Sequence, residues 1–303
     1  MTLRLRRISL FGSVAALSLA GAAIAQQQPD WNAIQVTATQ IRPGVAVLFG
    51  NGGNIGVSYG ADGTLIVDDQ FAPLTQKIQG SIAGLGATPV KFLVNTHWHF
   101  DHAGGNENFG KAGALIVAQT RVRDRLAAGG TVAGNNSAPA PTEALPVVTY
   151  DHSVSFHLNG DTIDVLHTGG GHTDGDSVVY WRKANVLHTG DMMMVNSGFP
   201  FIDLSSGGNV QHLIVSLDQL IAMTNSDTVI IPGHGPLARR GDLIAWRGMI
   251  ATAVDRVRTL KDAGRTLEQA KAAKPLAGLA DTSNAFFPED QFVESIWGSL
   301  EAH

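Results

Sequence analysis

Three histidines and one aspartate lie within six residues, in the letters HWHFDH that begin at His97. The apolar run VKFLV at 90–94 precedes them and predicts a β-strand that ends just before the motif. In extended backbone alternate side chains share a face, so we expect His97, His99 and Asp101 to project together, with His102 following where the chain turns. Imidazole and carboxylate groups without thiolate suit zinc, and they also suit iron or manganese. The motif therefore predicts a metal site at a strand end.

Three later segments supply further candidate ligands. The letters GGGHTD, TGD and PGHG place His172, Asp191 and His234 in turns that contain glycine. Each turn follows an apolar, strand-like run, so each can deliver a side chain to one edge of a sheet. His167 and His188 lie beside these turns, and we expect them to support the site rather than to bind metal directly.

In chain order the motifs are HxHxDH, a His in a GHT turn, an Asp in TGD and a His in PGHG. This set resembles the metallo-β-lactamase superfamily across nearly the whole predicted mature chain. The resemblance implies an α/β fold, namely a four-layer αβ/βα sandwich, and two zinc ions per chain. The ligands that it implies are His97, His99 and His172 for a first zinc, Asp101, His102 and His234 for a second, and Asp191, which bridges the two ions or binds the second.

The resemblance also implies a zinc-dependent hydrolase without a serine or cysteine nucleophile. Zinc lowers the pKa of bound water from 15.7 to about 7, so a metal-bound hydroxide is available near neutral pH to attack a carbonyl group. We assign Asp101 a catalytic role in addition to ligation. A non-catalytic metal-binding protein is the alternative, and the complete ligand set disfavours it.

Two positions depart from the branch of true β-lactamases, which the string GGNENFGKAGA at 104–114 otherwise resembles. That branch binds the second zinc with a Cys where this chain has Asp191, a choice typical of the superfamily's lactonases and thioesterases. Three residues later that branch has a Lys that holds the β-lactam carboxylate, and this chain has Met194. We expect a small-molecule substrate, with β-lactams as the first candidate and lactones or other esters or thioesters as the alternative.

Residues 1–25 are predicted to be a secretory signal peptide, leaving 26–303 as one metallo-β-lactamase-fold domain. A basic start with Arg4, Arg6 and Arg7 precedes an apolar run that ends in small residues at 23–25. The run is short for a membrane anchor. We therefore expect a periplasmic or secreted protein, exported by either the general or the twin-arginine route.

The charge composition argues against two classes of binding partner. The signal segment holds three arginines and no acid, so the remainder carries 18 basic and 26 acidic side chains and a net charge of −8. This charge argues against nucleic acid and anionic membranes as partners. The chain has no Cys, so an exported protein must be stabilised by its core rather than by disulfides.

The segments that flank the motifs carry four further expectations. Asp68 follows a predicted strand, and the resemblance implies that it is a buried carboxylate that orients a zinc-bound group, whereas Asp69 is expected to be an ordinary turn residue. The turn at 50–54 (GNGGN) has little side chain to hold it still, and it is expected to be a short flap that leaves the site open. Residues 129–142 are expected to form a mobile surface loop. Asn209 is expected to cap a helix.

Overall fold

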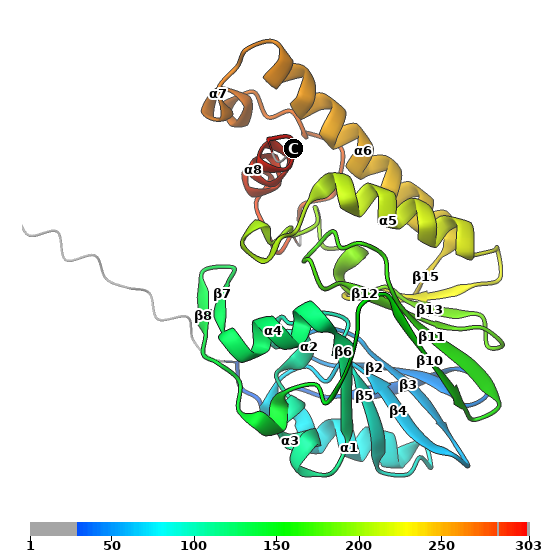
Figure 1. Ribbon diagram of the computed structural model, residues 1–303. Helices are drawn as coiled ribbons and strands as arrows, with labels where there is room; N and C mark the ends of the chain where they lie inside the picture. The colour runs from blue at the N-terminus through cyan, green and yellow to red at the C-terminus, as the bar shows by residue number, and fades with distance from the viewer. Residues whose placement is uncertain (1–28, 284, 302–303) are drawn as a thin grey trace, which may run out of the picture.

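The computed structural model describes residues 29–283 and 285–301, so the predicted signal peptide at 1–25 lies outside the described residues. Two β-sheets pack face to face, and helices cover both outer faces (Figure 1). This is the four-layer α/β sandwich that the resemblance implied. The described residues include no helix that is long and apolar enough to span a membrane.

The first sheet has seven strands in the order β1-β2-β3-β4-β5-β6-β9. Its strands are β1 (Thr37–Arg42), β2 (Val45–Phe49), β3 (Ile55–Gly60), β4 (Gly63–Val67), β5 (Val90–Val94), β6 (Leu115–Gln119) and β9 (Val148–Tyr150). The first four form an antiparallel meander, and β4, β5, β6 and β9 are parallel. Both faces of β2 and β4 are covered, which explains why these strands are continuous apolar runs rather than alternating ones.

The second sheet has six strands in the order β10-β11-β12-β13-β14-β15. Its strands are β10 (Ser153–Leu158), β11 (Asp161–His167), β12 (Ser177–Trp181), β13 (Val186–His188), β14 (Val229–Ile231) and β15 (Ala238–Arg239). Only β13 and β14 pair in parallel. The edge strand β10 alternates exposed and covered side chains, as expected for a strand with one face toward water.

The expectation of a mobile loop at 129–142 is wrong. This segment contains a two-stranded hairpin of β7 (Gly130–Val132) and β8 (Asn135–Ser137). The side chain of Val132 is buried in a small apolar cluster with Trp98 and Phe201, and this anchor holds the hairpin against the body of the protein.

Helices form the two outer layers. They are α1 (Thr75–Gly84), α2 (Phe100–Ala103), α3 (Asn106–Lys111), α4 (Thr120–Ala128), α5 (Val210–Met223), α6 (Arg240–Asp262), α7 (Leu267–Ala272) and α8 (Glu289–Ser299). The capping prediction is confirmed, because the Asn209 side chain accepts hydrogen bonds from the backbone N–H groups of Gln211 and His212. Helix α5 therefore begins directly beside the loops of the second sheet.

Three apolar clusters hold the layers together. The central one joins the inner faces of the sheets, for example Val47 and Val67 with Val179 and Trp181. The outer two pack α1 and α3 on the first sheet and α5, α6 and α8 on the second. Each fully buried aliphatic or Phe side chain contributes about 1.5–3 kcal/mol, so a core of this size is sufficient without disulfides.

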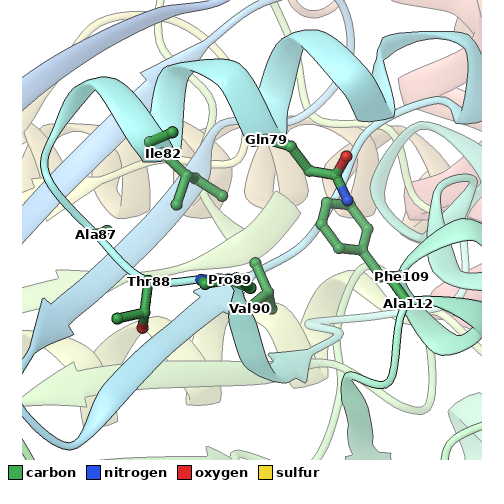
Figure 2. Close-up of a pocket in the computed structure, with 9 residues that line it drawn as sticks. Gln79, Ile82, Ala87, Thr88, Pro89, Val90, Phe109 and Ala112 are labelled. Atoms are coloured by element: carbon green, nitrogen blue, oxygen red, sulfur yellow. The ribbon is translucent and has the colours of Figure 1, made fainter.

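An outer hollow of about 230 Å³ opens on the outer face of the first sheet, between α1 and the segment 87–90 (Figure 2). Ile82 and Phe109 project into it. Its described lining contains no histidine, carboxylate, lysine or arginine. This hollow therefore lacks the residue types of the predicted metal site.

Candidate metal centre

The seven predicted ligands come from loops that follow β5, β11, β13 and β14, and the structure brings all seven together. The letters at 97–102 follow β5, His172 follows β11, Asp191 follows β13 and His234 follows β14. Since the carboxyl ends of these strands meet at one edge of the sandwich, residues far apart in sequence converge there.

One local expectation is wrong. The HWHFDH motif is not one extended stretch, because β5 ends at Val94, residues 96–97 form a bend, and Asp101 and His102 lie in the short helix α2. The backbone N–H groups of His102 and Ala103 both donate to the carbonyl of His99, which closes a helical turn at this point. Convergence of Asp101 with the histidines therefore results from this turn and not from strand alternation.

The ligand candidates form two clusters. The first cluster is His97, His99 and His172, and its ligand atoms lie within 4.8 Å of one another. The second cluster is Asp101, His102 and His234, within the same limit. In the second cluster His234 Nε2 is 3.2 Å from His102 Nε2 and 3.3 Å from Asp101 Oδ2.

Asp191 lies between the clusters and is 5% exposed. Its Oδ1 is 3.0 Å from His102 Nε2, and its Oδ2 is 3.4 Å from His234 Nε2 and 3.7 Å from His172 Nε2. One carboxylate thus faces nitrogen atoms from both clusters, which is the position that a bridging ligand requires.

Asp68 orients two of the histidines. Its Oδ2 lies 2.7 Å from His102 Nδ1 and 2.8 Å from the Thr96 hydroxyl, which donates to it. Because the Thr96 proton is used in this way, the contact of 2.9 Å between Thr96 Oγ1 and His97 Nδ1 requires the ring N–H of His97 to donate. The Nε2 atoms of both histidines are therefore left facing the centre.

Two other acceptors orient the rest of the first cluster. Asp203 Oδ2 is 3.0 Å from His99 Nε2, and the backbone carbonyl of Phe201 is 2.7 Å from His172 Nδ1. Each acceptor favours an N–H on the outer ring nitrogen. When both rings are neutral in this way, His99 Nδ1 and His172 Nε2, which lie 2.9 Å apart, face each other as lone pairs that can both bind a cation.

These atoms fit a metal ion on further grounds. His97 Nε2 is buried and has no hydrogen-bond partner among the described residues. A buried polar atom without a partner costs about 1–3 kcal/mol, and a metal ion satisfies such atoms by coordination. The donors are imidazole nitrogens and carboxylate oxygens, the set that zinc accepts.

The two clusters differ in charge. Burial and the nearby His99 charge lower the pKa of His172 to about 4, and burial with the charges of His102 and His99 lowers the pKa of His97 well below its usual value. Burial acts in the same direction on His234, but the carboxylates of Asp191 and Asp101 outweigh it and raise its pKa to about 9. In the absence of metal, His97 and His172 of the first cluster are therefore neutral at pH 7, whereas His234 of the second cluster is protonated.

The neighbouring carboxylates behave differently from each other. Asp68 is fully buried and orients His102, as the resemblance implied. The expectation for Asp69 is wrong, because this side chain is also fully buried and accepts a hydrogen bond from the Gly105 backbone N–H at 2.8 Å. Burial raises the pKa of Asp69 well above its usual value. Asp69 therefore supports the turn after α2 rather than facing solvent.

The turn at 50–54 is held more firmly than its glycines indicated. The Asn54 amide donates to the carbonyls of Pro232 and Gly235, both at 2.8 Å, and so ties the turn to the loop of His234. A Cβ atom at Gly53 would lie 2.2 Å from the His102 ring. Glycine is thus required here for close approach to the centre, and the expectation of an unrestrained flap is wrong.

Supporting residues that the motifs did not reveal include Asp203, Phe201, Thr96, Asn54 and Asp176. Asp176 accepts hydrogen bonds from the backbone N–H groups of His172 and Thr173 and so shapes that loop. Its position four residues after His172, in HTDGD, is a weak turn signal that could have indicated it. Asp203 has no such signal, because it reaches His99 only through the fold.

His167 and His188 also lie outside the described ligand clusters. His188 Nε2 donates to the Asn54 carbonyl at 2.9 Å, and its Nδ1 accepts from the Gly190 backbone N–H. His167 Nδ1 lies 2.7 Å from the Asp176 carbonyl. Both therefore support the ligand-bearing turns, as expected.

The open side of the centre has two hollows. The apolar hollow, of about 110 Å³, is lined by Val132, Met194, Phe201 and Phe287 together with residues of both clusters. The second hollow, of about 440 Å³, lies under residues 49–54, which join β2 to β3, and we call it the hairpin hollow after this β2–β3 hairpin. Neither hollow has a Lys or Arg among the described residues that line it.

Comparison with known proteins identifies the family. A profile described as the metallo-beta-lactamase superfamily matches residues 51–234. The probable metallo-hydrolase YqgX of Bacillus subtilis (strain 168) is 29% identical over 184 residues, which cover 57% of this chain and 83% of that protein. Metallo-beta-lactamase IND-1 of Chryseobacterium indologenes is 26% identical over 159 residues, covering 52% of this chain and 61% of that protein.

A solved structure of a metallo-beta-lactamase from Pontibacter korlensis superposes with a TM-score of 0.60 at 21% identity. The superposition covers 72% of this chain and 99% of that one, and it shows a shared fold. Together with a family match that spans more than half of the chain, these findings show that the protein is a member of the metallo-β-lactamase superfamily and a metallo-hydrolase.

Proposed function

We propose that this protein is a dizinc hydrolase in which His97, His99 and His172 hold one zinc, Asp101, His102 and His234 hold the other, and Asp191 bridges them. The position of Asp191, with one oxygen near His102 and the other near His172 and His234, carries the proposal. When bound, zinc supplies Lewis acidity and lowers the pKa of water to about 7.

The residues of the chain prepare the site for this chemistry. Asp68, Asp203 and the Phe201 carbonyl fix the histidine rings, so little reorganisation is needed on metal binding. Asp101 is 23% exposed and borders both hollows, where it can accept a proton beside a bound substrate. This placement supports the catalytic role assigned to Asp101.

The lining favours an uncharged lactone or other ester as the substrate. Met194 is buried at the wall of the apolar hollow, at the position where the true β-lactamase branch has a carboxylate-binding Lys. Since no described Lys or Arg lines either hollow, a substrate carboxylate held away from the zinc ions finds no cationic side chain to anchor it. A charged hydrogen bond of this kind contributes about 1.5–3 kcal/mol, so its absence disfavours substrates that depend on such an anchor.

β-Lactams are the second candidate. Their support comes from the relatives, since metallo-beta-lactamases are among the proteins that the chain is similar to. We expect β-lactam cleavage to be weak, because the carboxylate that most β-lactams carry has no anchor here.

Assays of zinc-loaded protein on matched lactone and β-lactam panels test the proposal. We expect higher kcat/KM on lactones, and complete loss of both activities on chelation. Met194→Lys should lower KM for carboxylate-bearing β-lactams by about tenfold and leave KM for neutral lactones unchanged. A wild-type preference for β-lactams would overturn the substrate assignment, and chelator-resistant hydrolysis would overturn the metal assignment.

We also propose that the protein is exported and then begins at or near Gln26. The basic start, the apolar run and the small residues at 23–25 support this. Mass spectrometry of the protein from its native host should find a chain without residues 1–25. An intact amino terminus starting at Met1 would contradict export by cleavage.

A further inference from the structure

A short segment from the C-terminal third of the chain reaches the metal centre. Residues 285–288 lead into α8 and lie outside the matched family region, which ends at residue 234. Phe286 and Phe287 of this segment line the apolar hollow beside the ligand candidates. The segment can therefore add a property that the shared family region does not determine.

Phe287 fixes this segment against the first cluster. Its ring stacks on the Phe201 ring with 4.3 Å between centroids and an interplanar angle of 18°. Phe201 in turn accepts the hydrogen bond of His172 through its carbonyl. The segment also packs closely on the loop between Asp191 and Asp203, because a Cβ atom at Gly198 would lie 2.7 Å from that of Ala285.

Phe286 has a different environment from Phe287. Its side chain is 63% exposed, and it is the one aromatic ring among the large apolar side chains that are exposed in the described residues. The ring lies 5.5 Å from the His234 ring, centroid to centroid. An exposed aromatic ring that is held beside a reaction centre offers apolar surface that a ligand can cover.

Phe286 also borders both hollows. Phe100, Asp101, His234 and Phe286 line both the apolar hollow and the hairpin hollow. A carbonyl group placed at Asp101 and His234 therefore has access to both hollows, and Phe286 is part of the wall of each. The apolar hollow is about 110 Å³, and an enclosed cavity of about 150 Å³ holds one benzene molecule, so this hollow, being open on one side, can take a flat ring or a short branched alkyl group.

Resting on the proposed hydrolase function, we propose that Phe286 is a specificity-determining residue that contacts the substrate. It selects neutral lactones and esters in which an aromatic or branched apolar group flanks the scissile carbonyl, with that group seated in the apolar hollow against Phe201 and Met194. The remainder of the substrate occupies the hairpin hollow. The contact is made equally in the ground state and in the transition state, so it acts on KM rather than on kcat.

The test compares γ-phenyl-γ-butyrolactone with unsubstituted γ-butyrolactone, using wild type, Phe286→Ala and Phe286→Tyr. Phe286→Ala should raise KM for the phenyl lactone by about tenfold, leave KM for the unsubstituted lactone within about twofold, and leave kcat and zinc content unchanged. Phe286→Tyr keeps the ring and should retain the wild-type KM. Val215→Ala removes exposed apolar surface on α5, away from the hollows, and should change neither KM.

Equal changes in KM for both lactones in Phe286→Ala, or no change in either, would overturn the inference. Should wild type cleave neither lactone, the proposed function is wrong, and binding of the phenyl-substituted γ-lactam measured by calorimetry still tests the contact. Weaker lactam binding by Phe286→Ala than by wild type upholds the role of Phe286, and equal binding overturns it.

Discussion

The first cluster consists of imidazoles alone, whereas the second cluster includes Asp101 and lies closer to the Asp191 oxygens. This difference sets their protonation, because burial dominates at His172 and lowers its pKa to about 4, while carboxylates raise the pKa of His234 to about 9. One cluster is therefore ready to accept a cation at neutral pH. The other must first release protons.

The two clusters also differ in their exposure to the hollows. The nitrogens of the first cluster are buried, which favours tight binding of an ion, whereas the second cluster is partly exposed at Asp101 and His234 and borders both hollows. We infer that the first cluster loads first and that the second is the more easily emptied. Asp191 lies beside residues of both clusters, so we expect its removal to change metal binding and turnover more than any other substitution.

Asp191→Ala should have the largest effect. Without the carboxylate, His102 and His234 lose the oxygens that lie 3.0 Å and 3.4 Å from their Nε2 atoms, and we expect the second zinc to be lost while the first stays. Turnover should fall by more than the factor of about 10–100 that outer partners of a metal ligand contribute. Elemental analysis and kinetics measure the two effects. Asp174→Asn, which removes a carboxylate paired with Arg125, is the matched control and should keep both ions.

Asp191→Ala protein that keeps two tightly bound ions and wild-type rates would place this residue outside the centre. Asp191→Cys sharpens the same point. A thiolate binds one ion through a single sulfur, so we expect two zinc ions to remain and the preference to move toward β-lactams relative to lactones.

Substituting the carboxylates that orient the histidines should lower the metal affinity of the two sites to different extents, with smaller effects than Asp191→Ala. Asp203→Asn should weaken the first site by about 10–100-fold, because the charge that orients His99 is lost. Asp68→Asn should weaken the second site by a similar factor through His102, and it should also affect the first through Thr96 and His97. Competition with a metal indicator measures both affinities. A variant of Asp203 that weakens only the second site would contradict the assignment of clusters.

The pH dependence follows from the same pKa shifts. The pKa values of His102 and His234 are raised, so binding at the second site displaces protons at pH 7, and its affinity should rise by up to about tenfold per proton and pH unit as the pH approaches 9. The contribution of His172 to the first site should vary little above about pH 5, because its ring is already neutral there. Calorimetry in buffers of different ionisation enthalpy counts the protons. Equal proton release at both sites would refute the charge difference.

Asn54→Ala should have the smallest effect. It removes two hydrogen bonds to the carbonyls of Pro232 and Gly235, and this should lower the free energy of unfolding by about 1–3 kcal/mol. Zinc content should not change, while KM should rise slightly because the turn at 50–54 borders the hairpin hollow. Thermal unfolding measures the loss. Asn136→Ala, in the exposed β7–β8 hairpin, should be nearly neutral.

Sequence patterns predicted the strand at 90–94, the helix that Asn209 caps and the seven side chains that the structure brings together at the centre, because apolar runs and glycine turns mark strand ends locally. They did not predict the hairpin at 130–137, whose stability depends on Val132 reaching Phe201 across the fold. They also assigned Asp69 to an ordinary turn, since burial of a carboxylate depends on packing. Asp203 and Phe286 were not found for the same reason, as their partners are distant in sequence.

Zinc-edge anomalous diffraction from crystals of the metal-loaded protein tests directly whether two zinc ions bind beside Asp191. We expect two peaks, one among His97, His99 and His172 and one among Asp101, His102 and His234, with Asp191 between them. A single peak, or two peaks of which neither lies beside Asp191, would contradict a dinuclear centre bridged by this carboxylate.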